Sequence, residues 1–167
     1  MNYFELFNLP EKFNIEIVEL SKKFHQLQRK FHPDLFNTQS ELIRIKALNN
    51  STIVNQGYRI LRDYLTRAEH LLFLNGLNIS DRKNIVYEKN FLIEQLSFYE
   101  EIDILKKSSF NKKNYNSLLI RINQIKKKYE YEMEKELEIK SWRKSAVIVN
   151  KLFFFRNLKN VLEELKQ

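Results

Sequence analysis

The residues best suited to chemistry in this sequence form a tripeptide, His32-Pro33-Asp34. Proline fixes its own φ and restricts the residue before it, so the imidazole and the carboxylate would be presented by a backbone of defined direction. The ring supplies a donor or an acceptor, and the carboxylate supplies an acceptor, which suits polar contacts to a partner protein. Taken in isolation, the same tripeptide is also compatible with a proline that merely ends a helix.

The histidines raise the alternative of a metal site or an enzyme built on His25, His32 and His70. A catalytic metal site normally has three protein ligands with a supporting second shell, and no motif such as HExxH is present. The chain has 0 Cys, which excludes disulfides, thiolate zinc sites and a cysteine nucleophile. We therefore expect no catalytic residue, no metal ligand and no cofactor in this chain.

The elements that position the tripeptide are expected to be helices, since only 2 Gly and 2 Pro occur among 167 residues. Apolar spacings of three and four predict an amphipathic helix over residues 15 to 31, with Asn14 as N-cap and Pro33 ending it. A loop from His32 to Gln39 follows. The predicted apolar stripe is Ile17, Leu20, Phe24, Leu27 and Phe31, and the opposite face carries Lys22, Lys23, Gln26, Arg29 and Lys30.

A second long helical pattern begins at Ser40, and its first half is expected to pack Leu42, Ile45 and Leu48 back against residues 15 to 31. A further apolar run ends at Asn75-Gly76, where glycine supplies a left-handed cap. This boundary predicts a domain over residues 1–75, a connector over 76–87 and a three-helix bundle over 88–167. The bundle helices are predicted at about 88–107, 114–139 and 141–165.

The first bundle helix carries two apolar arcs when its residues are placed at about 100° intervals. One arc, Phe91, Phe98, Ile102 and Leu105, is expected to form the core stripe. The adjacent arc, Leu92, Ile93, Leu96 and Tyr99, is expected to stay partly exposed and to bind a partner, with Glu100 at its edge. The alternative is a wider core that packs against the first domain. Three successive residues cannot share one face, so one of residues 153–155 should point outward, and Phe154 is our choice.

The net charge of the chain is +8, and residues 76–167 hold most of it, with 19 basic and 13 acidic residues. This permits a basic nucleic-acid-binding helical module as an alternative, but glutamates interrupt the lysines and no reading motif is visible. Its phosphate contacts would come from Lys106, Lys107, Lys112, Lys113, Lys126, Lys127, Lys128, Arg143 and Lys144. No apolar run approaches the roughly 18 residues of a membrane span, so we expect a soluble, cytoplasmic protein without membrane or nucleic-acid partners.

Residues 1–75 resemble a J domain, the module that stimulates ATP hydrolysis by DnaK-type chaperones. The resemblance is carried by Tyr3-Phe4, the basic helix, His32-Pro33-Asp34, the segment from Gly57 to Leu61, and Arg67-Ala68. The sequence is similar to the HscB co-chaperones of iron–sulfur cluster assembly over nearly its whole length. The segments that carry this similarity are residues 2–10 (NYFELFNLP), 27–29 (LQR), 67–72 (RAEHLL) and 91–96 (FLIEQL). Leu35 and His70 depart from residues common in J domains.

The resemblance implies an all-α, L-shaped protein that is not itself an enzyme. Its tripeptide would engage a specialised, HscA-like DnaK-type chaperone, toward which the basic residues Lys22, Lys23, Arg29 and Lys30 would steer association. The alternative is that these lysines and arginines only form a solvent-exposed helix face with no partner. The second implied partner is the iron–sulfur cluster scaffold protein, docked by Leu92, Ile93, Leu96, Glu100 and Phe154.

Overall fold

A computed structural model describes residues 1–80, 88–107 and 111–165. Within these ranges the chain forms seven α-helices and one short 3-10 helix, and contains no strand. The all-α prediction is therefore confirmed. The chain divides into two compact units, Met1–Gly76 and Leu77–Gln167. Residues 81–87 of the predicted connector lie outside the described residues.

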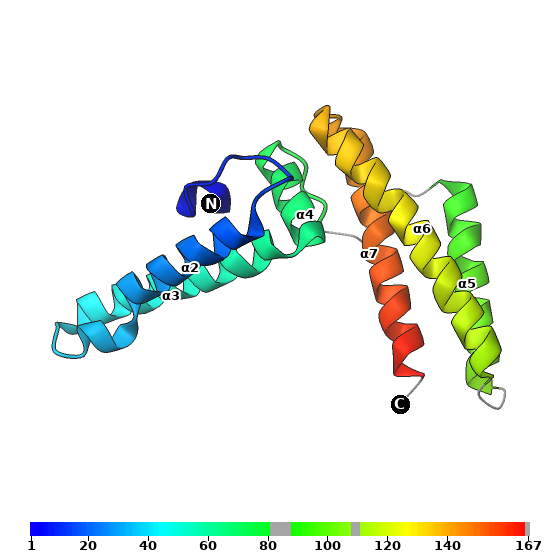
Figure 1. Ribbon diagram of the computed structural model, residues 1–167, viewed down its shortest axis with the longest axis horizontal. Helices are drawn as coiled ribbons and strands as arrows, with labels where there is room; N and C mark the ends of the chain where they lie inside the picture. Colours follow the sequence, from blue (N-terminus) through cyan, green and yellow to red (C-terminus); the bar gives the residue numbers. More distant parts are fainter. Residues whose placement is uncertain (81–87, 108–110, 166–167) are drawn as a thin grey trace. The chain divides into compact units, whose positions relative to one another are not determined.

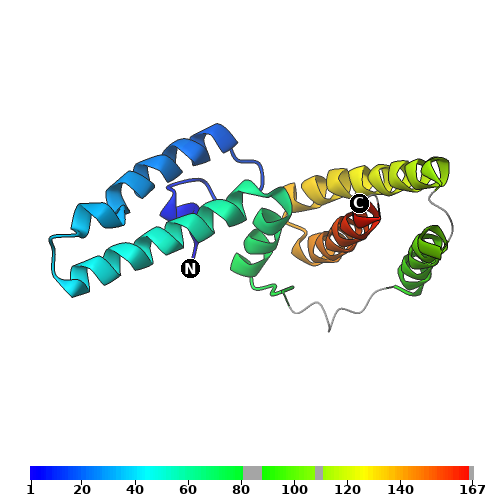
Figure 2. The same ribbon diagram turned by 90° about the horizontal axis from the view of Figure 1, so that it is seen from below.

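The first unit is organised around a hairpin of two long helices, α2 (Ile17–Phe31) and α3 (Glu41–Arg62), which lie side by side in Figures 1 and 2. The short helices α1 (Tyr3–Leu6) and α4 (Tyr64–Leu74) complete this unit. Its buried apolar residues come from all four helices, and include Phe4, Leu20, Phe24, Val54, Leu61, Leu65 and Leu72. The hairpin thus has a core of its own that fixes the direction of the connection between α2 and α3.

The sequence prediction for α2 is wrong at its N-terminal end and correct at its C-terminal end. Its N-cap is Glu16, so Asn14 lies too far before the first turn to cap it, and that prediction is wrong. The C-terminal end at Phe31 was correctly placed by Pro33. Part of the expected loop after it folds as η1, a 3-10 helix over Pro33–Phe36, because proline is well tolerated in the first turn of a helix.

The first half of α3 packs differently from the prediction. Leu42, Ile45 and Leu48 are 74%, 47% and 56% exposed, so the expectation that they face residues 15–31 is wrong. The helix instead buries Ala47, Val54 and Leu61, which are seven residues apart and therefore share one face. The aliphatic residues at 42, 45 and 48 lie on a different arc of the same helix. Ser40 is the N-cap of α3 as predicted, although its side chain makes no capping hydrogen bond.

Helix α1 is held against α3 and α4 by two close contacts. An added Cβ at Gly57 in α3 would lie 2.7 Å from Cδ1 of Tyr3, so only glycine permits this approach. From α4, the Nε2 atom of His70 accepts a hydrogen bond of 3.2 Å from the backbone N–H of Tyr3. Burial lowers the pKa of His70, the N-terminal amino group lowers it further, and Glu11 opposes the shift. His70 is therefore held in its neutral form, as this contact requires.

The second unit contains α5 (Lys89–Lys107), α6 (Lys112–Glu138) and α7 (Trp142–Glu164). These bounds lie within about two residues of the predicted ones. One core cluster joins the three helices, and it contains Phe91, Phe98, Ile102, Leu105, Tyr115, Leu118, Ile122, Phe155, Leu158 and Leu162. The predicted core stripe of α5 is thus confirmed in full. Gly76, where α4 gives way to this unit, has φ +83°, which confirms the left-handed cap.

Candidate partner-binding sites

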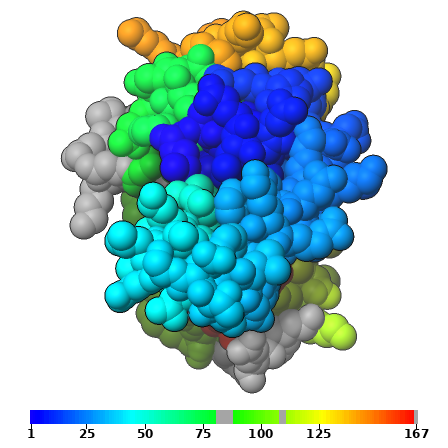
Figure 3. Space-filling model, turned by 90° about the vertical axis from the view of Figure 1, so that its left-hand side faces the viewer, coloured from blue at the N-terminus to red at the C-terminus, as the bar shows by residue number. Residues whose placement is uncertain are grey.

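The tripeptide lies at the tip of the α2–α3 hairpin, where α2 ends and η1 begins. The side chains of His32 and Asp34 are 58% and 77% exposed, and Pro33 is also exposed. Figure 3 faces this tip, and the light blue and cyan atoms around it are uncovered in that view. The hairpin therefore presents an imidazole and a carboxylate to solvent on a short, helical backbone.

The two polar groups of the tripeptide also contact each other. Nδ1 of His32 accepts a hydrogen bond of 3.3 Å from the backbone N–H of Asp34, which caps η1. An Nδ1 that accepts a hydrogen bond carries no proton, so in the neutral ring the proton is on Nε2. The Asp34 carboxylate lies 3.7 Å from the same Nδ1. The arrangement leaves an N–H donor and a carboxylate acceptor exposed to solvent two residues apart.

The basic face of α2 leads up to this tip. Lys22, Arg29 and Lys30 are exposed, as predicted. Lys23 is different, because its ammonium donates a hydrogen bond of 2.6 Å to the carbonyl of Asn8 and lies 3.6 Å from Glu19. The Lys23 ammonium is thus already engaged within the first unit, whereas Lys22, Arg29 and Lys30 are exposed to solvent.

A groove of about 680 Å³ runs beside the tripeptide between α2 and α3. Arg29 and His32, two of the predicted site residues, both line it, so the basic face and the tripeptide form one surface. His25, Gln28, Leu35 and Ser51 complete the lining. Sequence analysis assigned none of these four to the site. Gln28 and His25 precede His32 by about one and two helical turns, and this spacing was the available signal.

The second predicted surface lies on α5. Leu92, Ile93 and Leu96 are 44%, 56% and 63% exposed, and Tyr99 beside them is 47% exposed. All four lie on the arc that the helical spacing separated from the core stripe. Four large apolar side chains on one exposed face form a patch of the kind that marks interaction sites. We call Leu92, Ile93, Leu96 and Tyr99 the α5 patch.

Phe154 lies next to this patch through Tyr99. Phe153 and Phe155 are buried, and Phe154 alone of the three is half-buried. Its ring packs edge-on against the rings of Tyr99 at 5.9 Å and Phe91 at 5.6 Å. Phe154 therefore belongs partly to the core and partly to the surface, rather than pointing fully outward. Glu100 is exposed on the same helix as the patch.

Comparison with known proteins decides the family. Over 98% of its length the chain is 42% identical to the co-chaperone protein HscB of Buchnera aphidicola, and covers 94% of that protein. It is 35% identical to an HscB homologue of Vibrio vulnificus, with 100% and 98% of the two chains covered. The chain belongs to the HscB family of co-chaperones. Residues 88–163 match the family model described as the HSCB C-terminal oligomerisation domain.

Solved HscB structures share the fold. The chaperone HscB from Vibrio cholerae aligns with a TM-score of 0.85 and 32% identity, covering 99% of this chain and 98% of the other. The human co-chaperone HscB aligns with a TM-score of 0.89 and 25% identity, covering 99% and 82%. The first unit is accordingly the J domain of an HscB protein, and the second is its C-terminal helical bundle.

The alternatives from sequence analysis gain no support. None of the relatives described above is named as a nucleic-acid-binding protein. One lysine of the candidate phosphate contacts, Lys126, lies 3.5 Å from Glu130 in an ion pair. In the described part of the chain, no group of three His, Cys, Asp or Glu side chains is arranged to hold a metal ion. No helix among those residues is long and apolar enough to cross a membrane.

Proposed function

We propose that this HscB protein stimulates the ATPase of a specialised, HscA-like DnaK-type chaperone and delivers to it the scaffold protein on which iron–sulfur clusters are built. Delivery would promote the maturation of iron–sulfur proteins. The observation that carries this proposal is the exposed His32-Pro33-Asp34 at the tip of a hairpin in a chain of the HscB family. The chain itself needs no catalytic group for this role, because the hydrolysis takes place on the chaperone.

The tip and the basic face of α2 are the proposed chaperone-binding surface. Nε2–H of His32 and the carboxylate of Asp34 are both available for short polar contacts, which fix the register of a complex. Exposed cations at Lys22, Arg29 and Lys30 raise the rate of association with an acidic surface more than they raise the final affinity.

The α5 patch, with Glu100 and Phe154, is the proposed scaffold-binding surface. Its support is physical: four exposed apolar side chains on one helix face are costly to leave in water unless a partner covers them. The same segment carries the resemblance to HscB that implies a scaffold partner. Because α5 belongs to the second unit, its core is independent of the hairpin that presents the tripeptide.

Steady-state ATP hydrolysis by the cognate chaperone tests the proposal, measured with this protein and with the purified scaffold protein, separately and together. We expect synergistic stimulation for the wild type and none for Asp34→Asn or His32→Gln. Glu41→Gln is the matched control, since Glu41 is an exposed carboxylate in the first turn of α3 and should retain stimulation. The His32→Gln variant should still bind the scaffold protein. Absence of stimulation by the wild-type protein would refute the proposal.

A further inference from the structure

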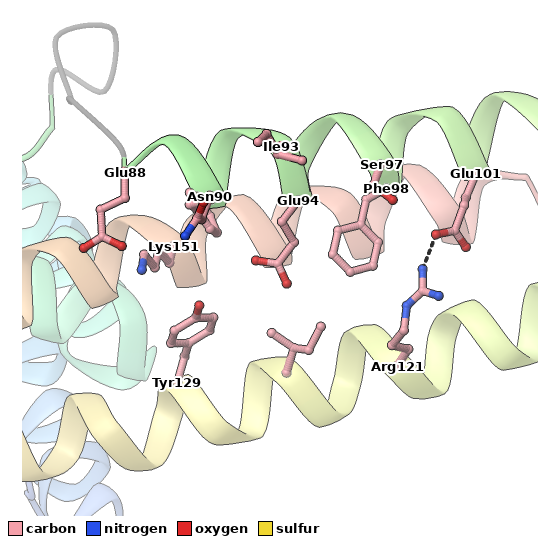
Figure 4. Close-up of a pocket in the computed structure, with 12 residues that line it drawn as sticks. Glu88, Asn90, Ile93, Glu94, Ser97, Phe98, Glu101, Arg121, Tyr129 and Lys151 are labelled. Carbon is pink, nitrogen blue, oxygen red and sulfur yellow. Dashed lines mark hydrogen bonds and ion pairs between the residues drawn. The ribbon is translucent and has the colours of Figure 1, made fainter.

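A groove of about 590 Å³ lies between α5 and α6 and is closed at one side by α7. Figure 4 shows the side chains that line it. Its apolar surface comes from Phe91, Ile93, Phe98, Ile125 and Tyr129, and polar groups from all three helices lie around them. These polar groups are Glu88, Asn90, Glu94, Ser97, Glu101, Arg121 and Lys151. The groove thus combines aromatic rings with several charges.

The cations of the groove are already engaged. The Arg121 guanidinium lies 5.0 Å from the centre of the Phe98 ring and forms an ion pair with Glu101. The Lys151 ammonium lies 5.1 Å from the centre of the Phe91 ring and 5.4 Å from that of Tyr129. Each basic group therefore has an aromatic face, and Arg121 also has its own carboxylate.

Glu94 stands between these two cations without an ion pair. Its half-buried side chain points from α5 into the groove in Figure 4. Within the described residues, no Lys or Arg nitrogen is placed at ion-pair distance from it, in contrast to its neighbour Glu101. A carboxylate that forms no direct ion pair can accept a charge-assisted hydrogen bond from an incoming cation.

The aromatic end of the groove also has a negative environment. Burial raises the pKa of the Tyr129 hydroxyl, and Glu94, Glu132 and Glu88 raise it further. This environment is local, because residues 76–167 as a whole carry 19 basic and 13 acidic side chains. Three glutamates act on this end of the groove against one ammonium, that of Lys151, so this end favours a further cation.

The groove is continuous with the α5 patch. Ile93 is 56% exposed as part of the patch, and it also lines the groove. Glu94 follows it directly in the sequence and turns toward α6. A protein segment that covers Leu92, Ile93 and Leu96 would consequently pass the mouth of the groove.

From this geometry we infer that the groove receives an arginine or lysine side chain of the scaffold protein that covers the α5 patch, with Glu94 as its counter-charge. The inference rests on the proposed function, and it adds a charged specificity contact to an apolar docking surface. Such contacts select among partners by charge, since a partner with an acidic side chain at this position would be repelled.

Binding of the purified scaffold protein, measured by isothermal titration calorimetry, tests the inference. Glu94→Gln keeps the size of the side chain and removes its charge, and we expect about tenfold weaker binding at low salt. Glu94→Lys should bind more weakly still. The matched control is Glu138→Gln, because Glu138 is an exposed carboxylate at the end of α6 and should bind as the wild type does. The difference between the wild type and Glu94→Gln should shrink between about 50 mM and about 300 mM salt.

The outcomes separate this inference from the proposed function. If Glu94→Gln binds the scaffold protein as tightly as the wild type does at low salt, while Leu96→Ala loses binding, the groove contact is refuted and the apolar docking surface stands. If the wild type does not bind the scaffold protein, the proposed function fails and this occupant of the groove fails with it. Urea denaturation of Glu94→Gln, expected to match the wild type, excludes loss of folding as the cause of weaker binding.

Discussion

Truncation of Leu96 tests whether the exposed arc of α5 is a docking surface or part of a wider core. The side chain is 63% exposed, so only about a third of it is removed from water on folding. Full burial of a leucine contributes about 1.5–3 kcal/mol, which limits the contribution of Leu96 to folding to about 1 kcal/mol. We therefore expect Leu96→Ala to lower the free energy of unfolding of the second unit by less than about 1 kcal/mol.

Phe98 provides the contrast on the same helix. It is 3% exposed and its ring packs edge-on against Phe155 at 5.7 Å. Replacing a buried phenylalanine by alanine typically costs about 3–5 kcal/mol, because contacts are lost and a cavity remains. Two residues that are two positions apart thus differ severalfold in their expected effect on stability, and urea denaturation measures both.

Leu96→Ala should affect binding of the scaffold protein much more than it affects folding. If Leu96 is a central contact of the scaffold interface, Leu96→Ala should weaken binding by about 2 kcal/mol, or roughly 30-fold in the dissociation constant. Ile120→Ala is the matched control, because Ile120 is 58% exposed on α6 and lies outside the patch. Its binding should be unchanged in titration calorimetry with the scaffold protein.

Two results would refute the reasoning about the patch. Loss of several kcal/mol of stability in Leu96→Ala would mean that the second arc of α5 is core and that the exposed face is wrongly assigned. Unchanged scaffold binding in a stable Leu96→Ala variant would mean that the patch serves another purpose. Equal weakening by Ile120→Ala would point to a general effect of apolar surface rather than to this face.

Three further predictions concern the first unit. Gly57→Ala should lower its stability by about 1–2 kcal/mol in urea denaturation, since the added Cβ would meet Tyr3 at 2.7 Å and this outweighs the better helix propensity of alanine; a more stable variant would contradict the packing. The pKa of His70 is lower in the folded protein than in the unfolded chain, where it is about 6.5. The contribution of His70 to the free energy of unfolding should therefore be constant above about pH 6.5 and decline as the pH falls from there toward the folded pKa. His70→Gln should weaken this decline in urea denaturation measured from about pH 7 to about pH 5. An identical pH dependence in the variant would show that another group is responsible. Replacing Lys22 and Arg29 by Gln should slow association with the chaperone severalfold in stopped-flow measurements at low salt and change little at high salt, whereas an effect that is independent of salt would exclude electrostatic steering.

The sequence predicted the helices well where the apolar pattern and the terminating residues agree. Pro33 placed the end of α2 at Phe31, and Gly76 marked the end of the first unit, because each residue restricts the backbone through its own covalent structure. The start of α2 was missed, because its N-cap Glu16 makes no side-chain capping hydrogen bond and is not a residue type favoured at this position. The exposed Leu42 and Leu48 were missed for a different reason. An apolar spacing of three and four fits either of two neighbouring arcs, and only the position of the partner helix decides which arc is buried.

The candidate sites divide in the same way. The tripeptide and the α5 patch were found from sequence because their signals are local: a fixed tripeptide, and an arc of one helix. The groove between α5 and α6 was not found, since Glu94, Tyr129 and Lys151 belong to three helices that are far apart in the chain. Nothing in a single helix indicates that Glu94 faces the ring of Tyr129 and not solvent. Which residues of different helices lie together can be known only from the way the helices pack.

The two proposed surfaces belong to units with separate cores, and this has a consequence for how the protein would act. A change at Asp34 should leave the core around Phe98 intact, and a change at Leu96 should leave the α2–α3 hairpin intact, so we expect each proposed activity to be lost alone. Covalent linkage of the two units nevertheless makes the second encounter intramolecular. Once the scaffold protein is bound on α5, docking of the chaperone at the tripeptide would bring both partners into one complex and raise the effective concentration of each near the other.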